Sequence, residues 1–305
     1  MVTPARKAGY RLLGSWFDYL LHTRPAEWPI VAAHTLVGYL LAVGLDGAVQ
    51  GEHLAAAALG AILWVVCLNG GTLALNSAHD RDEGDVAYLR RPPPPPAHLA
   101  GFGFALMAVG LIGAFLLPVG YRVAYSICLV MSVLYSVPPI RLKAVPGADW
   151  AVNMLGFGTL TPFAGWAATG LPLNPAGGLI LLGFCPLFAG LYPLTQIYQF
   201  EEDSRRGDRT LARALGVKRS LLVSFGAVGA AFAVFVLAGV RAGWEAHSAG
   251  RWLGLGLCAA AWGAILLSWL RRWRGMSVSE HQRGMYQALA AWALTDVLVV
   301  LAWGT

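Results

Sequence analysis

A succession of long apolar segments constrains this chain more than any other feature of its sequence. A helix that crosses a bilayer needs about 20 mostly apolar residues. Nine segments approach that length, at residues 28–48, 54–77, 99–118, 122–138, 149–170, 176–197, 220–240, 251–270 and 284–303. Only 12% of the 305 residues are charged, which is about half the share in soluble domains. We therefore predict an all-α membrane protein, in which one domain over residues 1–305 forms nine transmembrane helices after a cytoplasmic or interfacial segment at 1–27.

Basic residues lie almost entirely on one side of this predicted bundle. One set of helix ends comprises the N-terminal segment and the loops near 79–97, 139–147, 198–219 and 271–283, and it holds all but three of the 22 Lys and Arg residues. The three exceptions are Arg122, Arg241 and Arg251. Because cytoplasmic loops carry an excess of Lys and Arg, we predict an integral, multi-pass membrane protein with a cytoplasmic N-terminus and an external C-terminus. Orientation and membrane lipid account for the net charge of +6, so no nucleic acid is expected as a partner.

Half of the 16 acidic residues fall in two short segments on this cytoplasmic side. The first acidic segment holds Asp80, Asp82, Glu83 and Asp85, and the second holds Glu201, Glu202, Asp203 and Asp208. In each segment an amide precedes an acid by four residues, and the pairs are Asn76 with Asp80 and Gln199 with Asp203. Positions i and i+4 share one helix face. Each helix end is therefore expected to present an amide beside a carboxylate.

Two carboxylate clusters that face each other suit the binding of metal ions around a diphosphate. Mg²⁺ takes hard oxygen ligands and is usually held by one or two carboxylates together with substrate phosphates. Basic side chains would complete the phosphate site, and the candidates are Arg81, Arg141, Lys143, Arg205 and Arg209. Acidic loops between spans can also be solvated turns. Two clusters on one side, each with an amide partner, favour metal binding.

The first acidic segment resembles a motif of the UbiA superfamily of intramembrane prenyltransferases. That motif is typically N-D-x-x-D-x-x-x-D. Asn76 and Asp80 match it, whereas Ser77 replaces its early Asp and the last acid is displaced to Asp85.

Two further motifs carry the same resemblance. The family's second acidic motif is D-x-x-x-D-x-x-x-G, in which Asp203 and Gly207 match and Gln199 replaces the first Asp. The segment from Tyr135 to Lys143, which includes Arg141, resembles the family's cytoplasmic Y-x-x-P-P-x-R-x-K loop. Together the three ordered motifs extend over most of the chain.

The resemblance implies an active site with three sets of residues. The metal ligands would be Asp80, Asp82, Asp85, Glu202 and Asp203. The residues closest to the reaction would be Asn76, Asp80, Tyr135, Gln199 and Asp203. The residues that bind substrate would be Arg81, Arg141, Lys143, Asn153, Tyr198 and Arg209.

The resemblance also implies Mg²⁺-dependent transfer of a prenyl group from an isoprenoid diphosphate to a lipophilic or aromatic acceptor. Aromatic side chains could stabilise the allylic cation, and the candidates are Tyr135, Phe157, Trp166, Tyr192 and Tyr198. The departures from the motifs leave open a UbiA-type membrane terpene cyclase, which would release a cyclic hydrocarbon or alcohol without an acceptor. A non-enzymatic membrane carrier is the third alternative, and it would release no pyrophosphate.

Polar and sulfur-containing residues inside the apolar segments carry less functional information. Asp296 lies in the last span, where an ionisable side chain is costly, and we expect it to hydrogen-bond a neighbouring helix. The four cysteines are widely spaced within apolar segments. No disulfide or metal-ligand spacing is present, so we expect them to be small buried hydrophobic residues.

Overall fold

The computed structural model describes residues 4–49, 51–80, 89, 91–245 and 248–304. These residues contain no β-strand, which confirms the predicted all-α class. The α-helices are α1 (Pro4–Leu13), α2 (Trp16–His22), α3 (Trp28–Gly47), α4 (Gly51–Ile62), α5 (Gly70–Asp80), α6 (Leu99–Ala114), α7 (Val119–Ser136), α8 (Ala148–Asn153), α9 (Thr161–Ala168), α10 (Pro175–Gln196), α11 (Phe200–Arg206), α12 (Leu211–Arg241), α13 (Ala249–Arg272) and α14 (Val278–Trp303). Two π-helical segments, η1 (Leu63–Asn69) and η3 (Met154–Leu160), and three 3-10 segments, η2 (Leu142–Ala144), η4 (Ile197–Gln199) and η6 (Trp273–Gly275), continue or connect them.

Seven of the nine predicted spans coincide with long apolar helices among the described residues. The third predicted span forms α6, which has only 16 residues. The fifth is divided into α8, η3 and α9. Within η3, a Cβ added to Gly158 would lie 2.7 Å from the carbonyl oxygen of Phe184, so this segment packs directly on the backbone of α10. The seven helices indicate an integral membrane protein, and the count of nine spans remains a prediction.

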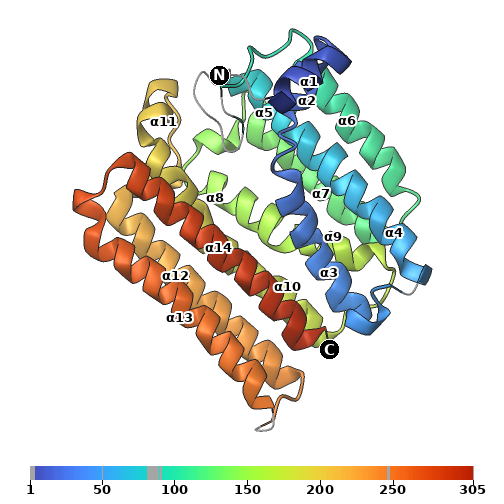
Figure 1. The fold of residues 1–305 in the computed structure, drawn as a ribbon, viewed down its shortest axis with the longest axis vertical. Helices are drawn as coiled ribbons and strands as arrows, with labels where there is room; N and C mark the ends of the chain where they lie inside the picture. Colours follow the sequence, from blue (N-terminus) through green and yellow to red (C-terminus); the bar gives the residue numbers. More distant parts are fainter. Residues whose placement is uncertain (1–3, 50, 81–88, 90, 246–247, 305) are drawn as a thin grey trace.

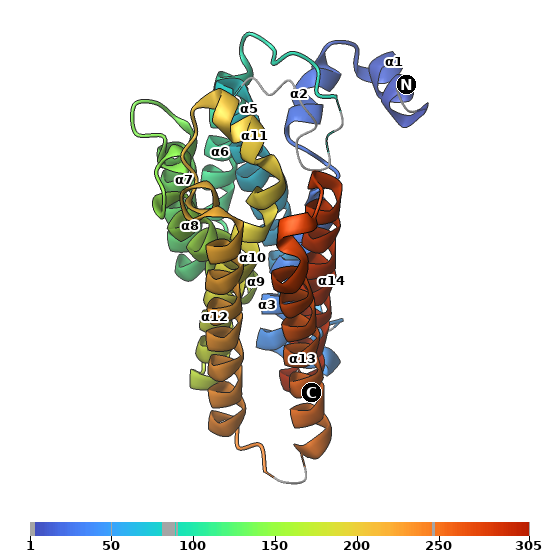
Figure 2. The same ribbon diagram turned by 90° about the vertical axis from the view of Figure 1, so that its left-hand side faces the viewer.

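The helices form an elongated bundle with two hydrophobic cores (Figure 1). One core joins α10, α12, α13 and α14 with part of α3, and the other joins η1, α5, α6, α7 and α9. Of the seven spans, the one that contains α10 is the most deeply buried, because 78% of the residues in its apolar 18-residue stretch lie inside the protein. Figure 2 shows α12, α13 and α14 running together along the long axis, with α5 and α11 near one end. The two acid-bearing helices therefore lie at the same end of the bundle.

Large apolar side chains cover the outside of the bundle. Ile112 on α6 is 73% exposed, Leu253 on α13 is 64% exposed and Val297 on α14 is 57% exposed. Extensive exposed apolar surface is unusual for a soluble monomer and suits contact with lipid. All four cysteines are free and buried, as expected from the sequence.

Glycines bring α3 and α9 into contact backbone to backbone. A Cβ added to Gly38 on α3 would overlap the carbonyl oxygen of Pro162, and one added to Gly165 on α9 would overlap the carbonyl oxygen of Thr35. Small residues allow membrane helices to approach this closely. The contact holds α3 against the α8–η3–α9 segment, which contributes residues to the cavity described below.

Gly38→Ala is expected to lower the free energy of unfolding by about 1–3 kcal/mol, because the methyl group would overlap backbone atoms that cannot rotate away. The measurement is unfolding of the purified protein in detergent, by heat or by titration with dodecyl sulfate. Gly229→Ala on α12 is the matched control. Gly229 is exposed and a Cβ there meets nothing within 4 Å, so this change should leave stability unchanged or raise it by up to about 1 kcal/mol. Equal stability of the two variants would contradict the contact.

Candidate active site

A cavity of about 440 Å³ lies among residues of both cores. Its polar lining includes Asn76, Asp80, Tyr135, Lys143, Asn153, Gln196, Gln199, Asp203, Asp208 and Thr210. Its aromatic lining includes Trp64, Phe157, Phe188, Tyr192, Tyr198 and Trp292. One cavity thus combines charged groups from the ends of helices with aromatic side chains from the middle of apolar segments.

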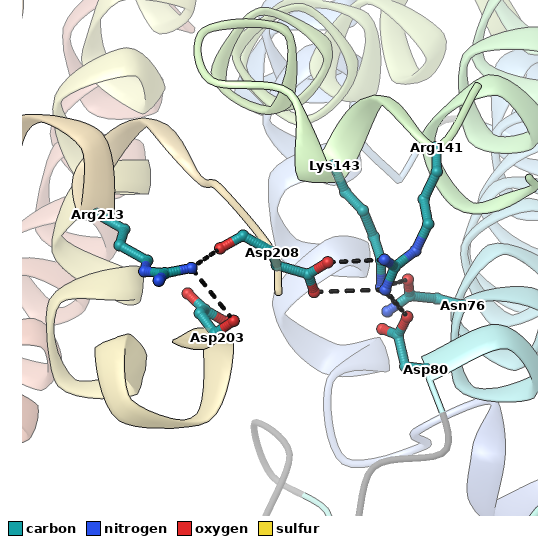
Figure 3. A network of polar contacts seen from close by, with 7 residues as sticks. All are labelled: Asn76, Asp80, Arg141, Lys143, Asp203, Asp208 and Arg213. Atoms are coloured by element: carbon teal, nitrogen blue, oxygen red, sulfur yellow. Dashed lines mark hydrogen bonds and ion pairs between the residues drawn. The ribbon is translucent and has the colours of Figure 1, made fainter. Parts of the chain in front are cut away.

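Basic residues neutralise the carboxylate at the end of α5 (Figure 3). Asp80 accepts a hydrogen bond from Arg141 Nη2 at 3.2 Å and forms an ion pair with Lys143 Nζ. Lys143 Nζ also donates to Asn76 Oδ1 at 2.9 Å. Asn76 and Asp80 therefore face the same side of α5, as their i, i+4 spacing predicts.

Arg141 joins this carboxylate to the second acidic segment. Its Nη1 lies 2.7 Å from Asp208 Oδ1, and its Nη2 lies 3.3 Å from Asp208 Oδ2. The Nη2 contact is a hydrogen bond and the Nη1 contact is an ion pair, and the opposite charges of the two groups strengthen the pair. The same guanidinium contacts Asp80, so acids that are far apart in the sequence meet on one basic side chain.

The turn after α7 directs both basic side chains toward the cavity. α7 ends at Ser136, and the Arg141 backbone N–H then donates to the carbonyl oxygen of Val137 at 3.1 Å. Arg141 adopts a left-handed φ of 40° before η2 carries Lys143 into a buried position. Burial lowers the pKa of Lys143, and the charge of Asp80 opposes this shift. Asp80 therefore stabilises the charged form of the buried lysine.

The helix α11 and the tight turn after it place two further acids at the cavity. Gly207 follows the last residue of α11 with a φ of 76°, a left-handed conformation that suits glycine. The Asp208 N–H then donates to the carbonyl oxygen of Asp203 at 2.9 Å. Arg213 on α12 donates to the carbonyl oxygens of both acids. The Asp203 and Asp208 residues are each 4% exposed and line the cavity.

Asp149, which the sequence analysis did not select, connects three of these elements. It is fully buried at the start of α8. It accepts hydrogen bonds from Gly147 N at 2.9 Å, Leu211 N at 3.0 Å and Gln196 Nε2 at 3.2 Å. It thereby joins the starts of α8 and α12 to the end of α10. An acid at the edge of an apolar segment is costly unless paired, and that cost was the signal that could have identified it.

Tyrosine hydroxyl groups and amide side chains form hydrogen bonds to one another in the cavity lining. Tyr135 Oη lies 2.9 Å from Tyr192 Oη, and Gln196 Nε2 donates to Tyr192 Oη at 3.0 Å. Gln199 Nε2 donates to Tyr198 Oη at 2.7 Å. These contacts orient polar atoms in a cavity whose other walls are largely apolar.

Most of the residues expected at the site do line this cavity, and Arg141 contacts Asp80 beside it. Arg209 is exposed and is not part of the lining, whereas Arg213 contacts the second acidic segment. Trp166 packs in the core and is also absent from the lining. Arg205 is exposed, pairs with Glu201 and does not line the cavity. Four candidates lie outside the described residues, namely Arg81, Asp82, Asp85 and the side chain of Glu202.

The helix expected to place Gln199 and Asp203 on one face is interrupted. Gln199 ends the 3-10 segment η4, and α11 begins at the next residue. The two side chains line the same cavity without sharing a continuous α-helix.

The donor chemistry of the cavity suits a hard divalent cation. Asp80, Asp203 and Asp208 supply carboxylate oxygens to its lining. No three His, Cys, Asp or Glu side chains among the described residues are grouped so as to hold an ion by themselves. Mg²⁺ is usually bound through one or two carboxylates, several waters and substrate phosphates, without an all-protein cage. The arrangement therefore fits Mg²⁺ that binds together with a diphosphate.

Solved structures share this fold at low sequence identity. A UbiA homologue from Archaeoglobus fulgidus, solved with GPP and Mg²⁺, aligns with a TM-score of 0.69 and 19% identity, covering 94% of this chain and 100% of that one. A structure of digeranylgeranylglyceryl phosphate synthase gives a TM-score of 0.68 at 12% identity, over 94% and 97% of the two chains. The apo UbiA homologue from Aeropyrum pernix K1 gives 0.62 at 19% identity, over 91% and 96%. No curated protein sequence matches the chain.

A sequence model of a whole family gives the more specific result. The model of the UbiA prenyltransferase family matches residues 31–293. The match includes both acidic segments and the basic loop between them. Side chains from all three of these segments line the cavity. The chain therefore belongs to the UbiA prenyltransferase family.

Proposed function

We propose that this protein is a Mg²⁺-dependent enzyme that ionises an isoprenoid diphosphate and transfers its prenyl group to a lipophilic or aromatic acceptor. One observation carries the proposal: Asp80 and Asp203, from distant helices, line one cavity together with Lys143. The Archaeoglobus fulgidus homologue of the same fold binds GPP and Mg²⁺, which is the chemistry that this combination of acids and bases would require.

The basic residues would bind the diphosphate oxygens. Lys143 and Arg141 are paired with acids, and phosphate oxygens would offer them equivalent charge-assisted hydrogen bonds. Mg²⁺ bound by Asp80 and Asp203 would neutralise the charge that develops on the leaving pyrophosphate. On the sequence resemblance, Asp82, Asp85 and Glu202 are further candidate ligands.

The aromatic lining would bind the isoprenoid chain and exclude water. The bond between the prenyl C1 and the diphosphate oxygen would break, with its electron pair leaving on pyrophosphate. The faces of Phe157, Phe188 and Trp292 would stabilise the allylic cation by cation–π attraction. The acceptor would form the new bond to C1 and lose a proton.

In the membrane, we place the acidic end of the bundle and the N-terminus on the cytoplasmic side, with nine crossings in a single domain. Two features support this placement. The excess of Lys and Arg lies on the segments of that side. In addition, α1 and the end of α14 lie at opposite ends of the bundle, as an odd number of crossings requires (Figure 1).

The proposal is tested by measuring pyrophosphate release from allylic diphosphates of ten, fifteen and twenty carbons, with product analysis. Release should require Mg²⁺, cease on chelation with EDTA and resume when Mg²⁺ is restored. With an acceptor present, the product should be the prenylated acceptor. A cyclic hydrocarbon or alcohol formed from the diphosphate alone would identify a terpene cyclase instead. No release from any of these diphosphates would contradict an enzymatic role.

A further inference from the structure

The cavity ends at the same level on three helices. The helices α3, α10 and α14 contact one another within the bundle (Figure 1). Their lining residues farthest from the acidic end are Val31, Phe188 and Trp292. One turn beyond these lie three residues that do not line the cavity, namely His34, Phe184 and Asp296. We call these last three residues the floor cluster, because they lie directly beneath the lining.

His34 supports the lining from below. Its ring stacks on Phe157 with the centroids 5.5 Å apart, and it meets the rings of Phe184 and Trp292 at 4.9 Å. Phe157 and Trp292 line the cavity, whereas His34 and Phe184 are fully buried. An isoprenoid that enters from the acidic end would therefore meet two aromatic rings that are packed against buried side chains.

Polar contacts fix the position of His34. Its Nδ1 lies 3.1 Å from Asp296 Oδ1, and its Nε2 lies 3.4 Å from the carbonyl oxygen of Gly158. Apolar side chains can repack around a change of volume. Separating His34 from Asp296, in contrast, would leave buried polar groups without partners. The floor cluster therefore resists displacement by a longer isoprenoid more strongly than hydrocarbon packing alone would.

The backbone at this level is also closely packed. The carbonyl oxygen of Thr35, the residue after His34, lies where a Cβ of Gly165 would be. On α10, the carbonyl oxygen of Phe184 lies 2.7 Å from the position of a Cβ on Gly158. Because interiors packed this densely yield little, α3 and α10 cannot withdraw to make the cavity deeper.

A second hydrogen-bonded pair closes the base of the cavity on its other side. Trp64 Nε1 donates to Thr161 Oγ1 at 3.2 Å, and both residues line the cavity. Trp64 is only 2% exposed, and its ring packs on the fully buried rings of Tyr121 and Tyr125. The depth of the cavity is thus set on both sides by side chains held through hydrogen bonds.

The volume above this base limits the length of an isoprenoid. The cavity measures about 440 Å³. At about 30 Å³ for each water-sized atom, it holds about fifteen heavy atoms. An isoprenoid of ten carbons would leave room for part of an acceptor, one of fifteen carbons would fill the cavity, and one of twenty carbons would exceed it.

We propose that the floor cluster sets the upper limit on isoprenoid length, so that the enzyme selects chains of ten or fifteen carbons against chains of twenty. This inference rests on the proposed function and names the class of its prenyl donor. His34 and Asp296 would not touch the isoprenoid. They are positioning residues, which act by holding Phe157 and Trp292 in place.

The experiment measures the affinity of the protein in detergent for geranyl, farnesyl and geranylgeranyl thiodiphosphates with Mg²⁺, from the rise in melting temperature on titration. The wild type should bind the two shorter compounds at least about tenfold more tightly than the longest, since a misfit of one methylene in an apolar pocket already has an effect of that size. Longer isoprenoids partition more strongly into micelles, so the ratio of affinities is compared among variants in one detergent.

Two double variants separate the space in the floor from its polarity. His34→Ala with Asp296→Ala removes volume, and it should bring the affinity for the longest compound to within about threefold of that for the farnesyl compound. His34→Leu with Asp296→Leu removes the polar pair but refills the space, so it should keep the preference of the wild type. Val297→Ala, at a 57% exposed residue beside Asp296, is the matched control and should leave the ratio unchanged.

Val31→Phe tests the same limit from above the floor. Val31 lines the cavity one turn before His34. A larger side chain there should weaken binding of the farnesyl compound about tenfold and leave binding of the geranyl compound nearly unchanged. This variant decides the question if the alanine double variant does not fold.

Equal affinity of the wild type for all three compounds would overturn the inference, since the isoprenoid would then leave the cavity sideways into lipid. Loss of the preference in the leucine double variant would also overturn it, because the space there stays filled. Pyrophosphate release from the matching diphosphates is recorded on the same samples. A length preference in binding without any release would contradict the proposed function and leave the floor standing, whereas equal binding with release would do the reverse.

Discussion

Asp80→Asn is expected to reduce the rate of pyrophosphate release by about a thousandfold, an effect of the size seen when a group that stabilises developing charge is removed. Asp80 contacts both Arg141 and Lys143, and it lines the cavity at the end of α5. An amide of the same shape offers no anionic oxygen to a metal ion and no counter-charge to the lysine. Initial rates at saturating prenyl diphosphate, measured across a Mg²⁺ titration, should show a lower maximum together with a higher Mg²⁺ requirement.

Glu201→Gln is the control for this substitution. Glu201 belongs to the second acidic segment, but its side chain is 80% exposed and pairs with Arg205 along one helix face. Exposed ion pairs contribute about 0–1 kcal/mol, so the rate should change less than about twofold. If both variants lost a comparable share of the rate, the loss would depend on the total negative charge of the protein and not on the position of Asp80 in the cavity.

Loss of activity in Asp80→Asn must also be separated from loss of structure. The substitution leaves the buried Lys143 with Asn76 Oδ1 as a neutral partner. Adding Lys143→Met to Asp80→Asn should restore part of the free energy of unfolding, since no uncompensated charge then remains buried. It should not restore activity. Recovery of activity in the double variant would mean that Asp80 acts only by neutralising the lysine.

The sequence predicted the helices well because apolar length is a local property. Seven spans followed from hydropathy, and the pairing of Asn76 with Asp80 followed from helical spacing. The division of the fifth predicted span was not anticipated. Pro162 lies at the start of α9 and cannot donate a helical hydrogen bond, and Gly158 packs against the backbone at Phe184, a contact between segments that no local pattern encodes.

Residues that line the candidate site were anticipated at helix ends and in the basic loop, which resembles a family motif, whereas the contacts that turns create between distant segments were not. Asp208 reaches Arg141 because Gly207 reverses the chain after α11. Asp149 became significant only when the fold brought Gln196 and the start of α12 to its carboxylate. Contacts of this kind depend on how helices approach one another, so composition and spacing alone could not identify them.

A buried pair between α3 and α14 supports the second large prediction. His34 Nδ1 lies 3.1 and 3.2 Å from the two carboxylate oxygens of Asp296, and His34 Nε2 lies 3.4 Å from the carbonyl oxygen of Gly158. The imidazole is fully buried and stacks on Phe157, with ring centroids 5.5 Å apart. The expectation that Asp296 hydrogen-bonds a neighbouring helix is confirmed. Because Phe157 and Trp292 line the cavity and both contact His34, the pair also supports its aromatic wall.

His34→Leu is expected to lower the free energy of unfolding by about 3–5 kcal/mol, because it leaves the buried carboxylate of Asp296 without its partner. Asp18→Asn is the control, since Asp18 accepts from Tyr10 in a partly buried position near the N-terminus and should cost about 1 kcal/mol. Unfolding in detergent is measured for Asp296→Leu, His34→Leu and the double variant. Replacing a whole buried pair by apolar residues is often neutral, so the double variant should be more stable than the sum of the single losses predicts. Additive losses would mean that the two side chains stabilise the bundle independently, and the pair would then not be the link that holds α3 to α14.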